Sequence, residues 1–210
     1  MDREIKAIFF DVDGTLWDST EICARGFNRA IERLIGKDYP KTNAEQLKTL
    51  FGKTTAEIGA GVFPDRSPQE QVDFTLECIK EEMVCFGEEA PKPYPGVPEM
   101  VKELSKRYPL FIVSNCEQGY IEFFMDSAGL TSYFKDHLSL GDTGLVKQGN
   151  IEEIIRRNHL KKAVYIGDVQ GDADSAHGAG IPIVYAAYGF GKIADAEFII
   201  HSPSELLDIF

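Results

Sequence analysis

The chain has 210 residues, with 22 Lys and Arg against 34 Asp and Glu, which gives a formal net charge of −12 at pH 7. A chain of this length buries about 70% of its unfolded surface and needs no disulfides to fold, and its hydrophobic content of 43% is typical of a globular protein. The acidic excess argues against nucleic acids and anionic membranes as partners, because both are bound through clustered Lys and Arg.

The sequence shows none of the usual signals of export or membrane insertion. No apolar run approaches the ~18 residues that span a bilayer, and the charged start, Met1–Lys6, does not resemble a signal peptide. The cysteines form no C-x-x-C pair and have no His partners at zinc spacing; they are Cys23, Cys78, Cys85 and Cys116. We therefore expect free thiols in a reducing, cytoplasmic environment.

Short apolar runs alternate with amphipathic helical patterns along most of the chain. The predicted strands are Ala7–Val12, Leu110–Val113, His137–Leu140, Ala163–Ile166, Ile183–Ala187 and Phe198–Ile200. The predicted helices between them are Val97–Arg107, Tyr120–Ala128, Ile151–Asn158 and Ala173–Ala179. Several strands are continuous Ile, Val and Phe, as in sheets buried on both faces. Alternation of strand and helix predicts a parallel α/β sheet with right-handed crossovers.

The segment 16–88 breaks this alternation, because it contains helical patterns but no convincing strand. One helical stripe is formed by Ile22, Phe27, Ile31, Leu34 and Ile35. A capping box opens a second helix at Ser67-Pro68-Gln69-Glu70. The apolar face of that helix is expected to be Val72, Leu76, Ile79 and Met83. We interpret residues 16–88 as an all-helical cap, inserted into a core that consists of residues 1–15 and 89–210.

The strongest chemical signal lies at the end of the first predicted strand, which runs into Asp11-Val12-Asp13-Gly14-Thr15. In an open α/β sheet, ligands bind beyond the carboxyl ends of the strands, so Asp11 is placed as a nucleophile or a metal ligand. Asp13 lies where the chain turns, and its carboxyl can reach a leaving group. Gly14 allows a tight turn, and backbone amides at this turn can face an anion.

Two further predicted strands also end in polar residues. The strand at Leu110–Val113 runs into Ser114 and Asn115, and the strand at Ala163–Ile166 runs into Gly167-Asp168, with Asp172 four residues further on. Carboxylates that converge at one point repel each other, so a shared cation is the economical explanation. Ligands that are all oxygen atoms favour Mg²⁺.

Lys147 precedes the predicted helix at Ile151–Asn158, for which Asn150 is the expected N-cap. A lysine at this place can neutralise a phosphate oxygen or a nucleophilic carboxylate. Taken alone, Lys147 would be a solvated surface lysine and Ser114 a helix cap. The polar segments occur together and in order, however, and this favours a common site.

These segments resemble the four motifs of the haloacid dehalogenase-like phosphohydrolase superfamily. The motifs are Asp11-x-Asp13-Gly14-Thr15, then Ser114 after an apolar strand, then Lys147, then Gly167-Asp168-x-x-x-Asp172. The resemblance covers essentially the whole chain, because the helical insertion is similar to that family's cap. It implies a Rossmann-like, three-layer α/β/α core and a cap that closes over the substrate. The family commonly has proline after the motif lysine, whereas this chain has Gln148.

The resemblance also implies catalytic roles. Asp11 would attack phosphorus and form an aspartyl-phosphate. Asp13 would act as general acid for the leaving alcohol and then as general base for the hydrolytic water. Ser114 and Lys147 would hold the phosphoryl oxygens.

Binding roles follow from the same resemblance. Mg²⁺ would be bound by Asp11, the backbone carbonyl of Asp13 and Asp168, with Asp172 in its inner or second shell. Gly14, Thr15 and Asn115 would contribute to substrate binding. The substrate would be a small phosphorylated metabolite.

Asp13 favours phosphoryl transfer, since the dehalogenating branch of the superfamily lacks the second aspartate. A sugar-phosphate mutase of the β-phosphoglucomutase type remains an alternative, because it shares the motifs and the cap. That branch typically places basic residues around the glycine turn of the cap, and Phe51-Gly52-Lys53-Thr54-Thr55 offers only Lys53. Lys53 is therefore a candidate substrate-binding residue of a phosphatase. The chain is most similar to phosphoglycolate phosphatase-like proteins.

Two features of the chain also occur in other classes of protein. Cys23-Ala24-Arg25-Gly26-Phe27-Asn28-Arg29 fits the C-x-x-G-x-x-R loop of cysteine-dependent phosphatases, but Cys23 falls on the helical stripe and no strand precedes it. Response-receiver modules also gather aspartates and a lysine at strand ends, but they lack a helical cap. A catalytically inactive, Mg²⁺-binding regulatory relative would keep the motifs, and it stays open as an alternative.

Overall fold

The computed structural model describes residues 5–210, so the prediction about the start of the chain falls largely on Met1–Glu4, outside the described residues. The chain divides into two compact units, of which the second spans Asp18–Lys92. The predicted cap began at residue 16, but Leu16 and Trp17 are fully buried in the first unit. The Leu16 carbonyl accepts a hydrogen bond from the Tyr94 N–H at 2.9 Å. This bond joins the end of the first segment of the first unit, Met1–Trp17, to the start of its second segment, Pro93–Phe210.

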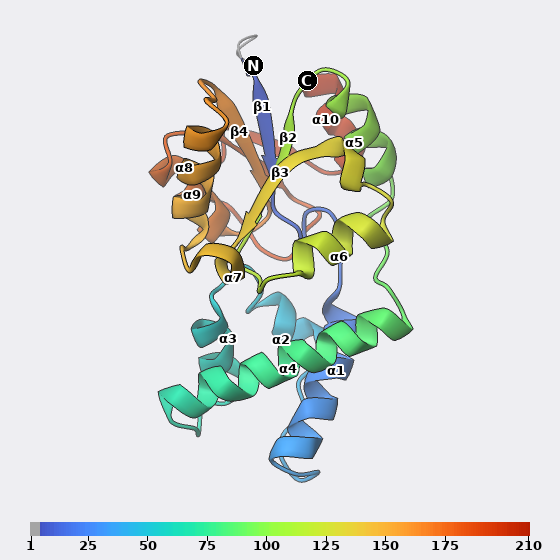
Figure 1. The fold of residues 1–210 in the computed structure, drawn as a ribbon, viewed down its shortest axis with the longest axis vertical. Helices are drawn as coiled ribbons and strands as arrows, with labels where there is room; N and C mark the ends of the chain where they lie inside the picture. The colour runs from blue at the N-terminus through green and yellow to red at the C-terminus, as the bar shows by residue number, and fades with distance from the viewer. Residues whose placement is uncertain (1–4) are drawn as a thin grey trace. The chain divides into compact units, whose positions relative to one another are not determined.

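The first unit contains, within the described residues, a six-stranded sheet in the order β3-β2-β1-β4-β5-β6 (Figure 1). All neighbouring strands pair in parallel. The strands are β1 (Ala7–Phe10), β2 (Leu110–Ser114), β3 (Phe134–Ser139), β4 (Ala163–Gly167), β5 (Ile183–Ala186) and β6 (Phe198–Ile200). The predicted parallel α/β sheet is confirmed, and β1, β2 and β4 are buried at every position.

Helices cover both faces of the sheet, which confirms the three-layer core (Figure 1). One face packs against α8 (Lys147–Arg157) and α9 (Gln170–Gly178), in a core that includes Phe9, Tyr165 and Ile154. The other side carries α5 (Val97–Ser105), α6 (Tyr120–Ser127) and α10 (Leu206–Ile209). Shorter elements are α7 (Leu140–Thr143) and 3₁₀ turns at Thr131–Tyr133 and Pro203–Glu205.

The strand order determines where a ligand can bind. From β1 the chain crosses to β2 and β3 on one side, and then to β4, β5 and β6 on the other. Ligands of open α/β sheets bind beyond the carboxyl ends of the strands at such a reversal. In this sheet the reversal lies between β1 and β4, whose carboxyl ends lead into the Asp11 and Asp168 segments.

The second unit consists of helices joined by turns and loops, with α1 (Thr20–Leu34), α2 (Ala44–Lys48), α3 (Thr55–Val62) and α4 (Pro68–Glu88). Helix α1 packs closely against α4 at Gly26, where an added Cβ would lie 2.6 Å from the Cα of Glu82. The predicted capping box between Ser67 and Glu70 is present at the start of α4. No helix among residues 5–210 is both long enough and apolar enough to cross a bilayer.

The prediction of which face of α4 is buried is wrong, because the buried positions are mostly the neighbours of the predicted ones in sequence. Val72, Leu76, Ile79 and Met83 are only half-buried. The buried positions are Thr75, Cys78, Glu82, Cys85 and Phe86. The packing of α1 determines this face, since Gly26 of α1 lets the two backbones come close at Glu82, one of the buried positions. The four cysteines are free thiols, as expected.

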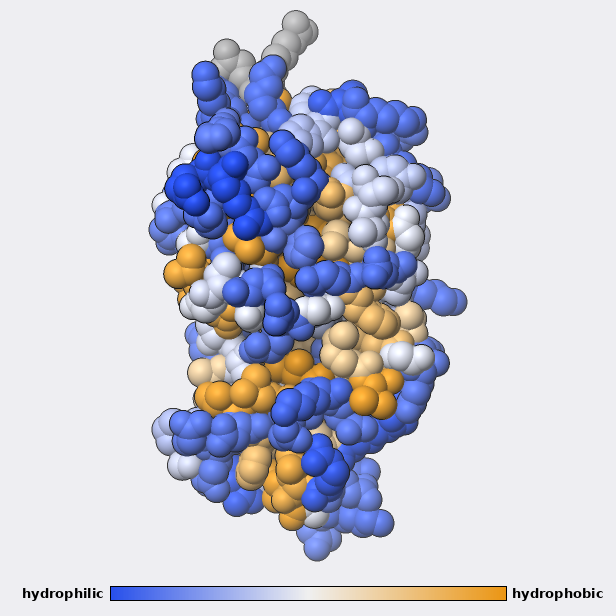
Figure 2. All heavy atoms as spheres, viewed as in Figure 1, coloured by the Kyte–Doolittle hydropathy of each residue, from blue (hydrophilic) through white to orange (hydrophobic). Residues whose placement is uncertain are grey.

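Hydrophilic side chains cover most of the face drawn in Figure 2, with apolar atoms in smaller patches between them. Few large apolar side chains are strongly exposed among the described residues; examples are Val84, Leu145, Val146 and Ile199. Scattered exposure of this kind is usual for globular proteins.

Candidate active site

The turn after β1 places two aspartates beyond the sheet. The carbonyl of Val12 accepts hydrogen bonds from three successive N–H groups, those of Thr15, Leu16 and Trp17. Gly14 has a φ of +79°, which only glycine adopts easily, and its N–H donates to the Trp17 carbonyl at 2.9 Å. The Asp-Gly turn therefore reverses the chain immediately after the strand.

Three carboxylates meet at the carboxyl ends of β1 and β4. Asp11, Asp168 and Asp172 each offer an oxygen within 4.8 Å of the others, and all three are buried. Asp172 lies in the first turn of α9, where its Oδ2 accepts the N–H groups of Asp168 and Val169 at 2.9 and 3.1 Å. Gly167 leaves room for this carboxylate, because a Cβ there would lie 2.5 Å from Asp172 Oδ2.

The ammonium group of Lys147 is buried among these carboxylates. Its Nζ lies 2.9 Å from Asp11 Oδ1 and 2.5 Å from Asp172 Oδ1. Lys147 is the first residue of α8, and its backbone N–H donates to the side-chain oxygen of Asn115 at 2.9 Å. Taken alone, the sequence around Lys147 is typical of the surface. In the structure the lysine is buried, because it is the first residue of α8 and its backbone is bound to Asn115.

The expectation that Asn150 caps this helix is wrong, because α8 begins at Lys147, four residues before the predicted start at Ile151, and Val146 is its N-cap. Asn150 lies inside the helix and is buried. Its side chain accepts from the Thr143 hydroxyl at 2.7 Å and donates to the Leu145 carbonyl at 2.9 Å. Asn150 therefore holds the loop that leads into Lys147.

The charges in this cluster do not balance. When all are ionised, Asp11, Asp168, Asp172 and Lys147 leave a formal charge of −2 in a buried place. Burial raises the pKa of Asp11 to about 6, opposed by Lys147 and aided by Asp172. Burial, with Asp172 next in effect, also raises the pKa of Asp168. For Lys147, burial favours the neutral amine, but Asp11 and Asp172 outweigh it and raise the pKa.

This donor set fits a hard divalent cation. All the groups offered by Asp11, Asp168 and Asp172 are carboxylate oxygens, which suit Mg²⁺ and not the softer metals. Asp11 Oδ1 is buried and makes no hydrogen bond, although the Lys147 ammonium is near it. Both oxygens of Asp172 already accept from protein donors, which favours a place for Asp172 outside the first coordination shell.

A loop after β5 holds Asp168, and sequence reasoning missed it. The N–H of Phe190 donates to Asp168 Oδ2 at 2.7 Å. A Cβ on Gly189 would lie 2.3 Å from the Asp168 Cβ, and one on Gly14 would lie 2.1 Å from Asp168 Oδ2. The Thr15 hydroxyl lies 3.4 Å from Asp168 Oδ1, so this predicted substrate-binding residue contacts the carboxylate. The two glycines of Tyr188-Gly189-Phe190-Gly191, directly after a strand, were the available signal.

Asp13 receives two side-chain donors that the sequence did not reveal. The indole Nε1 of Trp17 and the hydroxyl of Tyr120 both donate to Asp13 Oδ1, at 2.9 and 2.7 Å. Ser114 is buried at the carboxyl end of β2, the strand next to β1.

Nearly all the predicted site residues belong to the first unit. The exception is Lys53, an exposed residue in the turn between α2 and α3 of the second unit. Its role in substrate binding stays a prediction. Cys23 lies inside α1, and its thiol donates to the Ser19 hydroxyl at 3.3 Å. A helical position lacks the free backbone amides that a cysteine-phosphatase loop needs, so the structure agrees with setting that interpretation aside.

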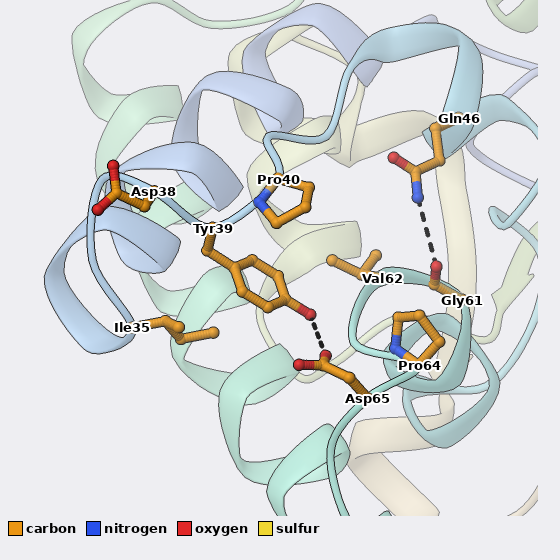
Figure 3. Close-up of a pocket in the computed structure, with 9 residues that line it drawn as sticks. All are labelled: Ile35, Asp38, Tyr39, Pro40, Gln46, Gly61, Val62, Pro64 and Asp65. Atoms are coloured by element: carbon orange, nitrogen blue, oxygen red, sulfur yellow. Dashed lines mark hydrogen bonds between the residues drawn. The ribbon is translucent and has the colours of Figure 1, made fainter.

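A pocket of about 610 Å³ lies within the second unit (Figure 3). Two prolines, Pro40 and Pro64, line it, together with Tyr39, whose hydroxyl donates to Asp65 at 2.5 Å. None of the predicted site residues is among those that line this pocket. It is therefore distinct from the carboxylate cluster.

Comparison with known proteins places this geometry in a family. A model of the haloacid dehalogenase-like hydrolase family matches residues 8–186. A phosphoglycolate phosphatase of Aquifex aeolicus is 26% identical over 213 residues, which cover 98% of this chain and 96% of the relative. The predicted class of enzyme, a phosphatase, is thereby supported.

Solved structures share the fold along nearly the whole chain. A predicted phosphoglycolate phosphatase of Haemophilus somnus has a TM-score of 0.83 at 22% identity, over 98% of this chain and 97% of that chain. A haloacid dehalogenase-like family protein of Streptococcus pneumoniae has a TM-score of 0.81 at 23% identity, over 98% of both chains. The predicted resemblance is confirmed: the chain belongs to the haloacid dehalogenase-like hydrolase family.

Proposed function

We propose that this chain is a Mg²⁺-dependent phosphatase that hydrolyses a small phosphomonoester through an aspartyl-phosphate on Asp11. The observation that carries the proposal is the buried cluster of Asp11, Asp168, Asp172 and Lys147, whose formal charge of −2 matches one divalent cation. A cluster of this kind costs free energy unless a cation compensates it. Its position at the reversal of the strand order is where such sheets bind ligands.

The chemistry has two displacement steps. In the first, an oxygen of Asp11 forms a bond to phosphorus, the bond from phosphorus to the leaving oxygen breaks, and Asp13 gives its proton to that oxygen. In the second, water attacks the same phosphorus and gives a proton to Asp13, while the bond from phosphorus to Asp11 breaks. The enzyme returns to its starting state with alcohol and phosphate as products.

The surrounding groups fit the needs of the phosphoryl group. Asp11, Asp168 and the backbone carbonyl of Asp13 would hold Mg²⁺, which supplies positive charge for the phosphoryl oxygens. The Lys147 ammonium and the Ser114 hydroxyl would donate to those oxygens. Asp172 would hold Lys147 in place, as the 2.5 Å contact between them indicates.

Phosphoglycolate is the first substrate to test, because relatives named phosphoglycolate phosphatase match this chain along almost their full length. A screen of phosphoglycolate, sugar phosphates and nucleoside monophosphates should give the highest kcat/KM for a small phosphomonoester. Isomerisation of a sugar 1-phosphate without release of phosphate would instead identify a mutase. Lys53 and its neighbours in the second unit are candidates for selecting the alcohol part of the substrate.

The nucleophile is tested by Asp11→Asn, with Asp174→Asn as a matched control. Asp174 is an exposed residue of α9, whose carboxylate accepts from Gln170 at 3.0 Å. Hydrolysis of p-nitrophenyl phosphate should fall by at least about 1,000-fold in Asp11→Asn and stay unchanged in Asp174→Asn. EDTA should abolish the activity and Mg²⁺ restore it. Turnover that survives EDTA would contradict the metal requirement, and an active Asp11→Asn protein would contradict the role of Asp11.

A further inference from the structure

The carboxyl of Asp13 is held by two donors from separate parts of the first unit. Trp17 lies four residues after Asp13, and its Nε1 donates to Asp13 Oδ1 at 2.9 Å. Tyr120, more than a hundred residues away in sequence, donates to the same oxygen at 2.7 Å. Two donors that converge on one carboxylate oxygen restrict the rotation of the group far more than one does.

Both donors are themselves fixed by packing. Trp17 is 0% exposed and Tyr120 is 4% exposed. Their rings meet edge to face with centroids 5.7 Å apart, and the Trp17 ring also meets that of Phe124 at 5.0 Å. Tyr120 is the first residue of α6, directly after Gly119, whose φ of +90° lets the chain turn into the helix.

We propose that Trp17 and Tyr120 are positioning residues, which fix the Asp13 carboxyl for proton transfer to the leaving oxygen of the substrate. This inference rests on the proposed function, because it concerns the acid of that reaction. An oxygen that accepts two hydrogen bonds is a poor site for a proton, so Asp13 carries the transferred proton on Oδ2. Exchange of the two oxygens by rotation would break both hydrogen bonds.

The reaction itself provides a sensitive measure of this positioning. A poor leaving group such as an alkoxide needs its proton during departure, whereas p-nitrophenolate departs readily without one. Misplacing the acid should therefore slow alkyl phosphates far more than aryl phosphates with acidic phenols. A general loss of structure would slow both alike.

The test compares Tyr120→Phe and Trp17→Phe with the control Tyr108→Phe. Tyr108 also donates its hydroxyl to an oxygen, the carbonyl of Phe210 at 3.1 Å, but it lies before β2, at the end of the strand opposite Ser114. For a series of phosphomonoesters, log(kcat/KM) is plotted against the pKa of the leaving alcohol or phenol. Tyr120→Phe should lose about 10- to 100-fold with alkyl phosphates and much less with p-nitrophenyl phosphate. The Tyr108→Phe line should overlie the wild-type line.

A second measurement needs no substrate. The chain contains one tryptophan, so a ¹H–¹⁵N spectrum shows one indole N–H signal, which reports the contact with Asp13 directly. That signal should shift in Asp13→Ala and in Tyr120→Phe and stay in place in Tyr108→Phe. An unshifted indole signal in Asp13→Ala would show that the hydrogen bond is absent and would overturn the inference.

The kinetic outcomes separate this inference from the proposed function. A wild-type protein that hydrolyses no phosphomonoester defeats the proposed function, and the inference with it. An active wild type whose Tyr120→Phe variant loses activity equally along the whole series, or loses none, defeats the positioning role alone. A steeper dependence on the leaving-group pKa in both variants supports it.

Discussion

Asp11 is buried beside like charges, and this gives the residue a measurable effect on stability. Burial, mainly, and Asp172 raise its pKa to about 6, although Lys147 acts in the opposite direction. An acid whose pKa is higher in the folded than in the unfolded state binds more protons when folded between those two values. Its favourable contribution to stability is therefore complete below about pH 4 and is lost as the pH rises through about 6.

We predict from this that Asp11→Asn stabilises the metal-free protein at pH 7. The variant removes one buried negative charge, and the expected gain in the free energy of unfolding is on the order of 1–3 kcal/mol. Thermal unfolding in EDTA should show a higher Tm for Asp11→Asn than for the wild type, with a smaller difference at pH 4.5. Added Mg²⁺ should raise the Tm of the wild type more than that of the variant.

The exposed control Asp174→Asn should leave the Tm within about 1 °C, as expected for a surface change. A lower Tm for metal-free Asp11→Asn would show that the pair with Lys147 outweighs the repulsion among the carboxylates.

Asp11, Ser114 and Asp168 could be predicted because each stands at the end of an apolar strand, and parallel strands end at the same edge of a sheet. That reasoning brought Asp11 and Asp168 together, as the structure does. It could not find Tyr120 or Phe190. Tyr120 reaches Asp13 from a helix, and Phe190 contributes only its backbone N–H, so neither residue type carries a signal for the contact.

At the scale of elements, α8 matters because it carries Lys147 at its first position, and an ion pair fastens its far end to β3. Arg157 in the last turn of α8 donates through Nε to Asp136 Oδ2 at 2.7 Å and through a second nitrogen to Oδ1. Asn158 adds a hydrogen bond to Asp136 at 2.8 Å. Burial alone would raise the pKa of Asp136, but the hydrogen bonds from Arg157 and Asn158 lower it.

We predict that Asp136→Asn destabilises the protein by about 1–2 kcal/mol at pH 7, because it removes a two-point, charge-assisted pair between two elements. An acid whose pKa is lower in the folded than in the unfolded state stabilises the protein at pH values above its unfolded pKa. This contribution to stability is lost as the pH falls through the folded pKa. The difference between variant and wild type should therefore shrink as the pH is lowered below about 4. Urea unfolding at several pH values measures it.

Glu153→Gln provides the matched control for this pair. Glu153 also binds an arginine at two points, but its partner Arg156 is exposed and lies in the same helix, so this pair joins no two elements. Pairs of this kind contribute less than about 0.5 kcal/mol. Equal losses in the two variants would contradict the special role of the contact between α8 and β3.

The start of α8 shows why element boundaries were harder to predict than element types. The sequence pattern placed the helix at Ile151, where the apolar periodicity begins, yet it starts at Lys147. Gln148, Gly149 and Asn150 have no apolar face, and glycine and asparagine are poor helix formers. Tertiary bonds compensate, since Asn115 accepts the Lys147 N–H and Asn150 binds the preceding loop.

At the scale of the whole molecule, the helical patterns of residues 16–88, which include no convincing strand, predicted a cap that differs in character from the α/β core. The second unit, Asp18–Lys92, has ion pairs between α1 and α4, such as Arg29 with Glu88 at 2.8 Å and Arg33 with Glu77 at 3.1 Å. The charges in these pairs lie far apart in sequence. The periodicity of each helix alone therefore could not predict how α1 aligns with α4. The same limit explains why the buried face of α4 was misplaced.

The net charge of −12 also has a kinetic consequence, since the proposed substrate is an anion. Part of the acidity lies in the buried carboxylates, which a divalent cation and Lys147 would neutralise. The rest acts at longer range, and the hydrophilic face drawn in Figure 2 is in contact with solvent. A field of this sign repels a phosphomonoester dianion on approach, and salt screens it with a Debye length of about 10 Å at 0.1 M.

We therefore predict that kcat/KM for a phosphomonoester dianion stays constant or rises, by up to about threefold, as NaCl is raised from about 0.02 to 0.15 M at saturating Mg²⁺. The physical reason is that screening weakens repulsion between like charges. Initial rates at low substrate concentration measure the effect, and a parallel Mg²⁺ titration at each salt concentration keeps the metal site filled. A steep fall in kcat/KM would mean that a local positive field attracts the substrate and outweighs the net charge. The buried Lys147 alone would be too weak a source of such a field. Exposed cations such as Lys53 would then be the first residues to replace.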